Sequence, residues 1–319
     1  MKIVVLDRSS VGEDVSIEPL EKYGEVEAYL TTKDEEAPER VKDADIIVVN
    51  KTPMNERILN KASRVKLICE FATGYDNIDL AYCTNRGIRV ANVVNYSTAV
   101  VAQHTVACVL YLLEKLPYYD SYVKSGAYSS QLRFSHFGMP FQELDGKTWG
   151  IIGMGNIGSR VASIAEAFGC RVITHSISGS PGKMGYEQVE FDALLRQSDI
   201  LTLHCPLSEK TRGLMNLDAF RKMKRTAVLV NVARGAVVKE EDLYTALKEN
   251  LIMAAGIDVL CQEPLALDHP LLRIQDSTKL LITPHMAWAG IEARTRLVTE
   301  TCLNIESFLG GGMRNALNP

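Results

Sequence analysis

Short apolar runs without polar alternation recur along the whole chain and alternate with longer segments of helical period. A strand with one face in water alternates apolar and polar residues, whereas a strand buried on both faces is apolar throughout. Such strands are typical of parallel sheets covered by helices, and their alternation with helices favours a doubly wound α/β fold. The predicted strands are residues 2–6, 46–50, 67–71, 90–92, 148–153, 171–174, 200–204, 227–231, 255–259 and 280–283.

The 319 residues suffice for two such sheets, since a domain takes ~150 residues. Residues 97–119 read as one long helix, with Pro117 near its end. We place one domain before this helix and a second from it onward. A last predicted helix, residues 292–309, could return to the first domain, and we expect residues 310–319 to be frayed. The predicted fold class is α/β, with two doubly wound, Rossmann-like parallel-sheet domains and a cleft between them.

The composition is that of an ordinary globular protein, with 46% hydrophobic and 23% charged residues. A formal net charge of −4 gives no reason to expect nucleic acid or an anionic membrane as a partner. The longest mostly apolar stretch, residues 100–113, is shorter than the ~20 residues that span a bilayer. No secretory signal is visible. The seven cysteines form no CxxC pair, so we expect free, mostly buried thiols in a reducing cytoplasm.

A glycine motif, Gly153-x-Gly155-x-x-Gly158, stands between a predicted strand and a predicted helix. This context is what a dinucleotide-binding loop requires, and without it the motif would be a plain glycine-rich turn. The first glycine permits a tight turn, the second lets a pyrophosphate approach the backbone, and the third lets helix and strand pack closely. The amide groups at the start of the helix would then face the phosphates.

The usual acidic partner of the ribose is missing from this site. Dinucleotide sites that hold a free ribose 2′-hydroxyl place Asp or Glu after the second strand, but Ser176 follows the second strand here, and the nearest cation is Lys183. Without a carboxylate the site does not repel a 2′-phosphate, and yet it offers no arginine to bind one. These residues therefore leave the choice between NAD and NADP open, and we take NAD as the expected cofactor with NADP as the alternative.

Polar side chains follow three further predicted strands. Arg234 comes after residues 227–231, Asp258 and Glu263 come at and after residues 255–259, and His285 comes after residues 280–283. The planar arginine fork suits a 2-oxo carboxylate. A histidine paired with a carboxylate can donate the proton that carbonyl reduction needs. The plainer alternatives are a surface arginine on a turn and a structural histidine. The other five histidines show no metal-ligand spacing, so no metal is expected.

Several motifs occur in order along the chain: residues 74–79, the glycine loop 153–158, residues 194–200, His204-Cys205-Pro206, Thr211, Leu214, residues 223–235, Asp258, Glu263-Pro264 and Pro284-His285. In these motifs the chain resembles the D-isomer-specific 2-hydroxyacid dehydrogenase family. The resemblance is nearest to the glycerate dehydrogenase, or hydroxypyruvate reductase, branch, through residues 50–53, 147–150 and 285–289. Ser176 and Lys239 depart from the residues that are commonest in the family.

The resemblance implies roles for individual residues. Arg234 would bind and polarise the substrate, His285 would be the acid and base, and Glu263 would orient it. Asp258 would bond the nicotinamide carboxamide. The implied substrate-binding residues are Lys51, Thr73, Gly74, Arg234, His285 and Trp288. The implied cofactor-binding residues are Thr98, Gly153, Gly155, Asn156, Ile157, Gly158, Ser176, Cys205, Pro206, Thr211, Val232, Ala233, Asp258 and His285.

The resemblance also implies a discontinuous substrate-binding domain, residues 1–97 plus 286–319, around a dinucleotide-binding domain, residues 98–285. It implies a homodimer formed through the cofactor domains. The expected reaction interconverts a small 2-oxo acid, hydroxypyruvate or glyoxylate, and D-glycerate or glycolate. A D-lactate-type dehydrogenase is one alternative. A non-catalytic, NAD-sensing binding protein, like the co-repressor relatives of the family, is another, because a fold does not determine a function.

Overall fold

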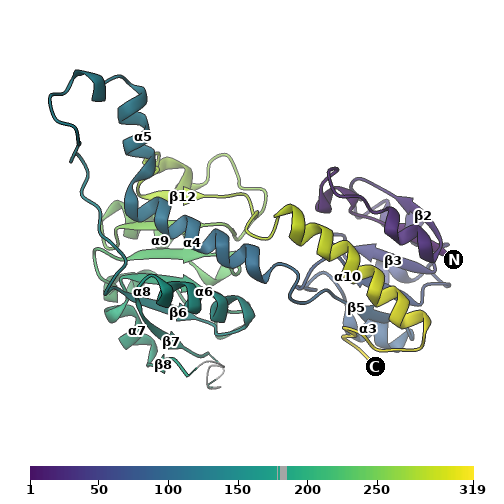
Figure 1. Ribbon diagram of the computed structural model, residues 1–319. Coiled ribbons are helices and arrows are strands. Elements are labelled where there is room, and N and C mark those ends of the chain that lie inside the picture. Colours follow the sequence, from purple (N-terminus) through teal and green to yellow (C-terminus); the bar gives the residue numbers. More distant parts are fainter. Residues whose placement is uncertain (178, 180–184) are drawn as a thin grey trace. The chain divides into compact units, whose positions relative to one another are not determined.

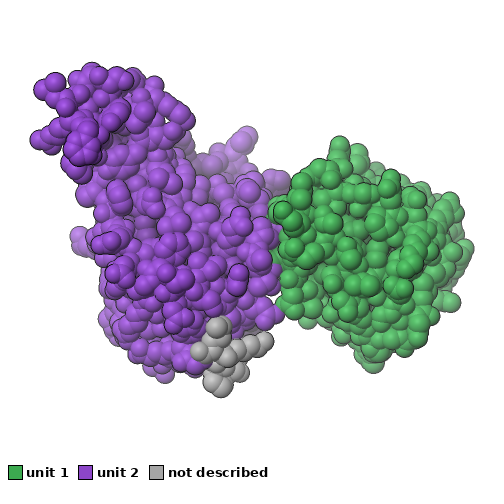
Figure 2. All heavy atoms as spheres, viewed as in Figure 1, with its two compact units in different colours: residues 1–97, 289–319 green, residues 98–288 purple. Residues whose placement is uncertain are grey.

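The computed structural model describes residues 1–177, 179 and 185–319. It divides into two compact units, coloured separately in Figure 2. Unit 1 consists of Met1–Ser97 and Ala289–Pro319, and unit 2 consists of Thr98–Trp288. The chain returns to unit 1 at Ala289, where the sequence had suggested residue 286.

Unit 1 is built on a parallel five-stranded sheet in the order β2-β1-β3-β4-β5. Its central strands are apolar and buried, as their composition predicts. The edge strand β2 was not predicted, because its sequence Glu-Val-Glu-Ala is short and partly exposed. The strands are β1 (Lys2–Val5), β2 (Glu25–Ala28), β3 (Ile46–Val49), β4 (Leu67–Glu70) and β5 (Arg89–Ala91).

The helices of unit 1 include the last helix of the chain, α10 (Ile291–Leu309), which packs on β4 and on the 3₁₀ helix η2. The prediction that the final ten residues are frayed is wrong. Leu317 donates its amide to the carbonyl of Val90 at 2.8 Å, and buried Asn318 accepts from the amide of Val90 at 2.7 Å. The tail thus covers the β5 edge. The other helices are η1 (Arg8–Val11), η2 (Glu18–Tyr23), α1 (Ala37–Val41), α2 (Glu56–Leu59) and α3 (Leu80–Asn85).

Unit 2 is built on a parallel seven-stranded sheet in the order β12-β11-β10-β9-β6-β7-β8. The sequence did not predict the two-residue edge strand β8, which is exposed and polar. The strands are β6 (Thr148–Ile152), β7 (Arg171–His175), β8 (Glu187–Gln188), β9 (Ile200–Leu203), β10 (Val228–Asn231), β11 (Ala254–Ile257) and β12 (Leu280–Ile282). Both sheets confirm the predicted α/β class.

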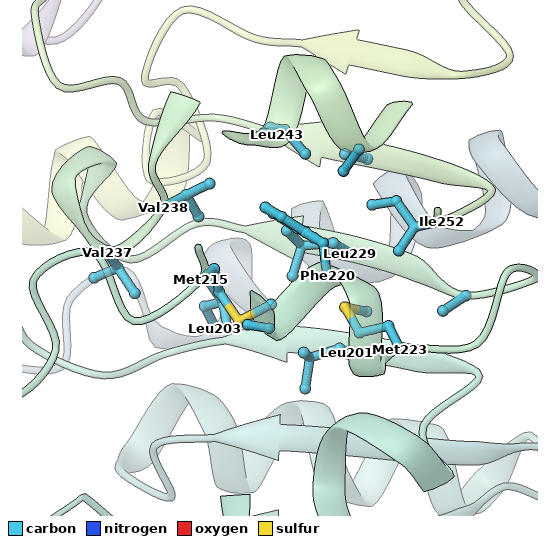
Figure 3. Packing of buried hydrophobic residues seen from close by; sticks show 14 of the residues in the cluster. Leu201, Leu203, Met215, Phe220, Met223, Leu229, Val237, Val238, Leu243 and Ile252 are labelled. Carbon is cyan, nitrogen blue, oxygen red and sulfur yellow. The ribbon is translucent and has the colours of Figure 1, made fainter. Parts of the chain in front are cut away.

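Helices cover both faces of the larger sheet, and each face has its own core. Val228 and Val230 of β10 pack on one face with α4 and α6, while Leu229 between them packs on the other. Figure 3 shows Leu229 among Leu201, Phe220 and their neighbours on that second face. The helices of unit 2 are α4 (Thr98–Glu114), α5 (Leu116–Lys124), η3 (Tyr128–Ser130), α6 (Asn156–Ala167), α7 (Phe191–Gln197), α8 (Leu217–Lys222), η4 (Gly235–Val237), α9 (Glu240–Lys248) and η5 (Pro270–Arg273).

The long helix predicted over residues 97–119 is two helices, because the chain breaks at Lys115. This residue has a left-handed backbone, with φ of 56°, and α4 and α5 meet at a bend of 59°. Pro117 has no amide hydrogen to continue the helix, yet it is well tolerated in the first turn of a new one. Lys115 is buried, and its Nζ donates to the carbonyl of Thr278 at 3.1 Å.

The structure also shows whether any helix could span a membrane and which state the cysteines are in. No single helix among the described residues is long and apolar enough to cross a membrane. The two helices α4 and α5 taken together would be long and apolar enough, but they are bent against each other. All seven cysteines are free; Cys261 is exposed and the others are buried. Burial raises the pKa of the Cys205 thiol to about 11, so this side chain behaves as a small apolar group.

Candidate active site

The candidate residues of unit 2 gather at one edge of its sheet. Parallel strands all end at the same edge, and the strand order reverses between β6 and β9. Ligands of open α/β sheets bind at the carboxyl ends of the strands, at such a switch point. The glycine loop follows β6, Ser176 follows β7, Cys205 follows β9, and Arg234, Asp258 and His285 follow β10, β11 and β12.

Each glycine of the loop after β6 has a distinct environment. Gly153 has φ of 96°, and a Cβ there would lie 2.7 Å from the backbone nitrogen of Cys205. A Cβ on Gly158 would collide with the carbonyl oxygen of Gly153. These two glycines are therefore required by the fold. A Cβ on Gly155 would meet nothing within 4 Å, so open space lies before the first turn of α6, where the amides can face an anion.

The remaining predicted cofactor residues lie around this loop or at the start of α4. Thr211 is buried and closes the loop after β9, where its Oγ1 donates to the carbonyl of Pro206 at 2.7 Å and accepts from the amide of Ser208 at 2.7 Å. Ser176 begins the turn after β7, while Lys183 lies outside the described residues. The others are Thr98 at the start of α4, Asn156 and Ile157 in the first turn of α6, and Val232 and Ala233 after β10.

His204 directly follows β9 and has both ring nitrogens buried. Neither nitrogen has a hydrogen-bond partner in the part of the chain that the structure describes. Burial lowers the pKa of this imidazole to about 3, so the ring is neutral at ordinary pH.

The loop that carries Arg234 is held by its own backbone and by a neighbouring loop. Asn231 at the end of β10 accepts from the amide of Ala233 and donates to the carbonyl of Arg234, both at 3.0 Å. A Cβ on Gly235 would collide with the backbone of Leu260. Gly235 thus lets the arginine loop lie directly against the loop that leads to Glu263. The sequence alone did not indicate this role of Gly235, although its position directly after Arg234 could have suggested it.

Glu263 and His285 form the pair that the sequence suggested. Nδ1 of His285 lies 2.7 Å from Oε2 of Glu263, and Oε1 of the same carboxylate accepts from the amide of Leu260 at 2.9 Å. An ionised carboxylate only accepts hydrogen bonds, so Nδ1 carries a hydrogen and Nε2 is the nitrogen that can exchange a proton. Both side chains are about one-third exposed, at 33% and 32%, which leaves Nε2 room to reach a ligand.

Asp258 anchors the turn on which His285 stands. Its carboxylate is buried and accepts from the hydroxyl of Thr283 at 2.6 Å and from the amides of Met286 and Ala287, each at 2.9 Å. Its carbonyl accepts from the amide of His285 at 2.8 Å. His285 has φ of 53°, a conformation that costs a non-glycine residue energy and that this network stabilises.

His104 of α4 extends this network. Its Nε2 lies 3.1 Å from the Thr283 hydroxyl, and because that hydroxyl gives its only hydrogen to Asp258, the imidazole must donate. Sequence reasoning missed this contact, since His104 and Thr283 are far apart in the chain.

The predicted residues of unit 1 lie at the carboxyl edge of its own sheet. Lys51 follows β3, and its amide donates to Asp7 at 3.0 Å. Thr73 and Gly74 follow β4. The Thr73 hydroxyl donates to the carbonyl of Val93, and the Thr73 carbonyl accepts from the side chain of Asn92, both at 2.7 Å. Trp288 is the last residue of unit 2. Among the described residues, no group of three or more His, Cys, Asp or Glu is placed to hold a metal ion.

The chain is similar to known proteins over most of its length. Residues 106–287 match the family model of the D-isomer specific 2-hydroxyacid dehydrogenase NAD binding domain. The chain is 37% identical to a hydroxypyruvate reductase of Blautia hydrogenotrophica over 100% of both chains. It is 36% identical to a glycerate dehydrogenase of Methylorubrum extorquens, over 99% of this chain and 98% of that one.

Solved structures superpose over almost the whole chain. An acyclic imino acid reductase in complex with NADPH and D-Arg is 33% identical, with a TM-score of 0.88 over 99% of this chain and 100% of that chain. A D-lactate dehydrogenase of Aquifex aeolicus, complexed with NAD and lactic acid, is 29% identical, with a TM-score of 0.85 over 100% and 99%. Together with the family match, these relatives show that the chain belongs to the D-isomer specific 2-hydroxyacid dehydrogenases, a family of nicotinamide-dependent oxidoreductases.

Proposed function

We propose that this protein reduces a small 2-oxo acid, hydroxypyruvate or glyoxylate, to D-glycerate or glycolate, and catalyses the reverse oxidation. The observation that carries the proposal is the pairing of His285 with Glu263 at 2.7 Å, on the same sheet edge as Arg234 and the glycine loop. Relatives named hydroxypyruvate reductase, glycerate dehydrogenase and glyoxylate reductase support this substrate class.

The proposed mechanism assigns one task to each side chain. The nicotinamide, when bound, supplies the hydride to the carbonyl carbon. Nε2 of His285 donates a proton to the carbonyl oxygen as charge develops there, and Glu263 stabilises the protonated ring. The Arg234 guanidinium binds the carboxylate and polarises the carbonyl. The proposal also assigns Lys51 and the backbone of Thr73 and Gly74 to the substrate carboxylate, and Trp288 to the substrate.

The substrate-binding domain in this proposal is residues 1–97 plus 286–319, and the dinucleotide-binding domain is residues 98–285. The proposed cofactor is NAD, with NADP as the alternative, because Ser176 supplies neither a carboxylate for the ribose nor a charge for a 2′-phosphate. Solved relatives hold either cofactor, as the complexes with NADPH and with NAD illustrate.

The direct test follows the loss of near-ultraviolet absorbance of the reduced cofactor, with hydroxypyruvate and glyoxylate, in parallel assays with NADH and NADPH. Turnover with either substrate supports the proposal, and the preferred cofactor reveals the effect of Ser176. Turnover with pyruvate or a branched 2-oxo acid alone would keep the mechanism but refute the substrate assignment. Cofactor binding without turnover of any 2-oxo acid would favour a sensing protein.

A matched pair of substitutions tests the glycine loop as the cofactor site. Gly155→Ala adds a methyl group to open space, so the melting temperature should stay close to that of the wild type while cofactor binding weakens about tenfold or more, because the pyrophosphate loses its close approach. Gly158→Ala places its methyl group against the backbone of Gly153, so it should lower the melting temperature. Differential scanning fluorimetry and cofactor titration measure both effects. Unchanged cofactor affinity in Gly155→Ala would contradict this placement.

We further propose that the protein is a homodimer formed through unit 2. Residues 116–143 form an arm that extends away from the rest of that unit (Figure 1). The arm exposes Leu132, Phe134 and Phe137 by 106%, 91% and 79%. Water solvates such apolar side chains poorly, and a second copy of the chain would cover them. Sedimentation velocity should show a dimer, and replacing all three side chains by serine should shift it toward a monomer. A monomeric wild type at micromolar concentration would refute the proposal.

A further inference from the structure

Glu70, the last residue of β4, has a carboxyl group that is fully buried and only half satisfied. Its exposed fraction is 0%. Oε2 accepts a hydrogen bond from Nδ2 of Asn77 at 3.2 Å, whereas Oε1 is buried and has no hydrogen-bond partner among the described residues. An ionised carboxylate so placed would carry a full charge with one donor, which is strongly unfavourable.

The neighbouring Asp7 has the hydrogen-bond donors that Glu70 lacks. It accepts from the amides of Asn50, Lys51 and Thr52 and from the Thr52 hydroxyl, at 2.9–3.1 Å. Glu70 has no such shell. Burial raises the pKa of Glu70 to about 9. The charges of Asp7 and Asp76 raise this pKa further, while the hydrogen bond from Asn77 and the charge of Lys51 lower it. Glu70 is therefore a neutral acid at ordinary pH.

The side chain of Asn77 links Glu70 to the loop after β3. The same Nδ2 of Asn77 that donates to Glu70 also donates to the carbonyl of Thr52 at 3.3 Å. The backbone joins the loops as well, since Met54 donates its amide to Asn77 and accepts from the amide of Asp79, both at 2.8 Å. Asn77 thus connects the loop of Lys51 to the loop that follows Gly74.

We propose that Glu70 is a positioning residue for the substrate. Its carboxyl group, through the hydrogen bond to Asn77, fixes the loops that carry Lys51 and Thr73-Gly74. The inference rests on the proposed function, because these loops are the proposed binding site of the substrate carboxylate. Ionisation of Glu70 would add a negative charge near the carboxylates of Asp7 and Asp76 and would loosen both loops. Substrate affinity should therefore depend on the protonation of Glu70.

The test compares Glu70→Gln with Glu70→Met. Glutamine keeps the acceptor for Asn77 and cannot ionise, whereas methionine keeps a similar length and removes the acceptor. Glu70→Met should raise the KM for hydroxypyruvate about tenfold, as expected for losing a buried hydrogen bond, while the KM for the reduced cofactor stays within about twofold. Glu70→Gln should keep a KM close to that of the wild type at neutral pH. Glu25→Gln, an exposed glutamate on β2, is the control and should change neither value.

The pH profile separates a positioning role from a merely structural one. The KM of the wild type for hydroxypyruvate should rise as pH passes about 9, and that rise should be absent in Glu70→Gln. The same alkaline rise in both proteins would overturn the proposal, and so would an unchanged KM in a folded Glu70→Met variant. If Glu70→Met does not fold, the pH profile of KM for Glu70→Gln, compared with that of the wild type, decides whether the proposal holds. A wild type that turns over no 2-oxo acid would instead refute the proposed function.

Discussion

Replacing His285 by alanine should lower kcat for reduction of the 2-oxo acid by about 100-fold or more, because the carbonyl oxygen would lose its proton donor as the hydride arrives. The imidazole is already oriented for this task, since Glu263 holds Nδ1 at 2.7 Å and leaves Nε2 for the substrate. Glu263→Gln should cause a smaller loss, because an amide oxygen can still accept from Nδ1 but carries no charge to stabilise the protonated ring.

A second histidine provides a control. His269 also pairs with a carboxylate, Glu240, at 3.1 Å, but it lies at the start of η5 and has no proposed role in the chemistry. His269→Asn should keep kcat within a few-fold of the wild type. Steady-state kinetics with the better of the two cofactors makes the comparison. If His285→Ala kept kcat within about tenfold of the wild type, His285 could not be the general acid.

Replacing Arg234 by leucine should lower kcat/KM for the 2-oxo acid by about 100- to 1,000-fold, because the site would lose both the binding partner of the carboxylate and the positive charge beside the developing oxyanion. Arg234→Lys keeps the charge but not the planar fork, so it should be intermediate, with most of its loss in KM. Nη1 of Arg234 donates to the carbonyl of Ala233 at 2.9 Å. Asn231 and Gly235 also hold this loop, so we expect Arg234→Leu to fold.

The control for this series is Arg221→Leu, an exposed arginine on α8 that pairs with Asp218 three residues away. A surface ion pair of this kind contributes little, so activity and melting temperature should stay near the wild-type values. Kinetics across a range of substrate concentrations separates kcat from KM. Equal kcat/KM in Arg234→Leu and the wild type would exclude Arg234 from substrate binding and restore the plainer interpretation of a surface arginine.

The amino-acid sequence by itself determined the α/β class, most strands of both sheets and the family. Residues such as Val228–Asn231 are apolar without alternation because both faces of the strand are buried, and that pattern is local. The sequence also singled out Arg234, Glu263 and His285 as candidate catalytic residues, because each follows a predicted strand and parallel strands end at one edge.

Tertiary structure alone decided the features that depend on partners far away in the chain. The tail residue Asn318 is ordered by Val90, and the exposed edge strands β2 and β8 exist only because a neighbour pairs with them. In the sequence, Glu70 is simply the polar residue that ends the apolar strand Leu67–Glu70, and nothing there sets it apart. Its burial beside Asp7 and its single donor, Asn77, follow from the packing of loops after three strands. Local periodicity encodes which face of an element is buried, but the order of strands in the sheet decides which side chains meet there.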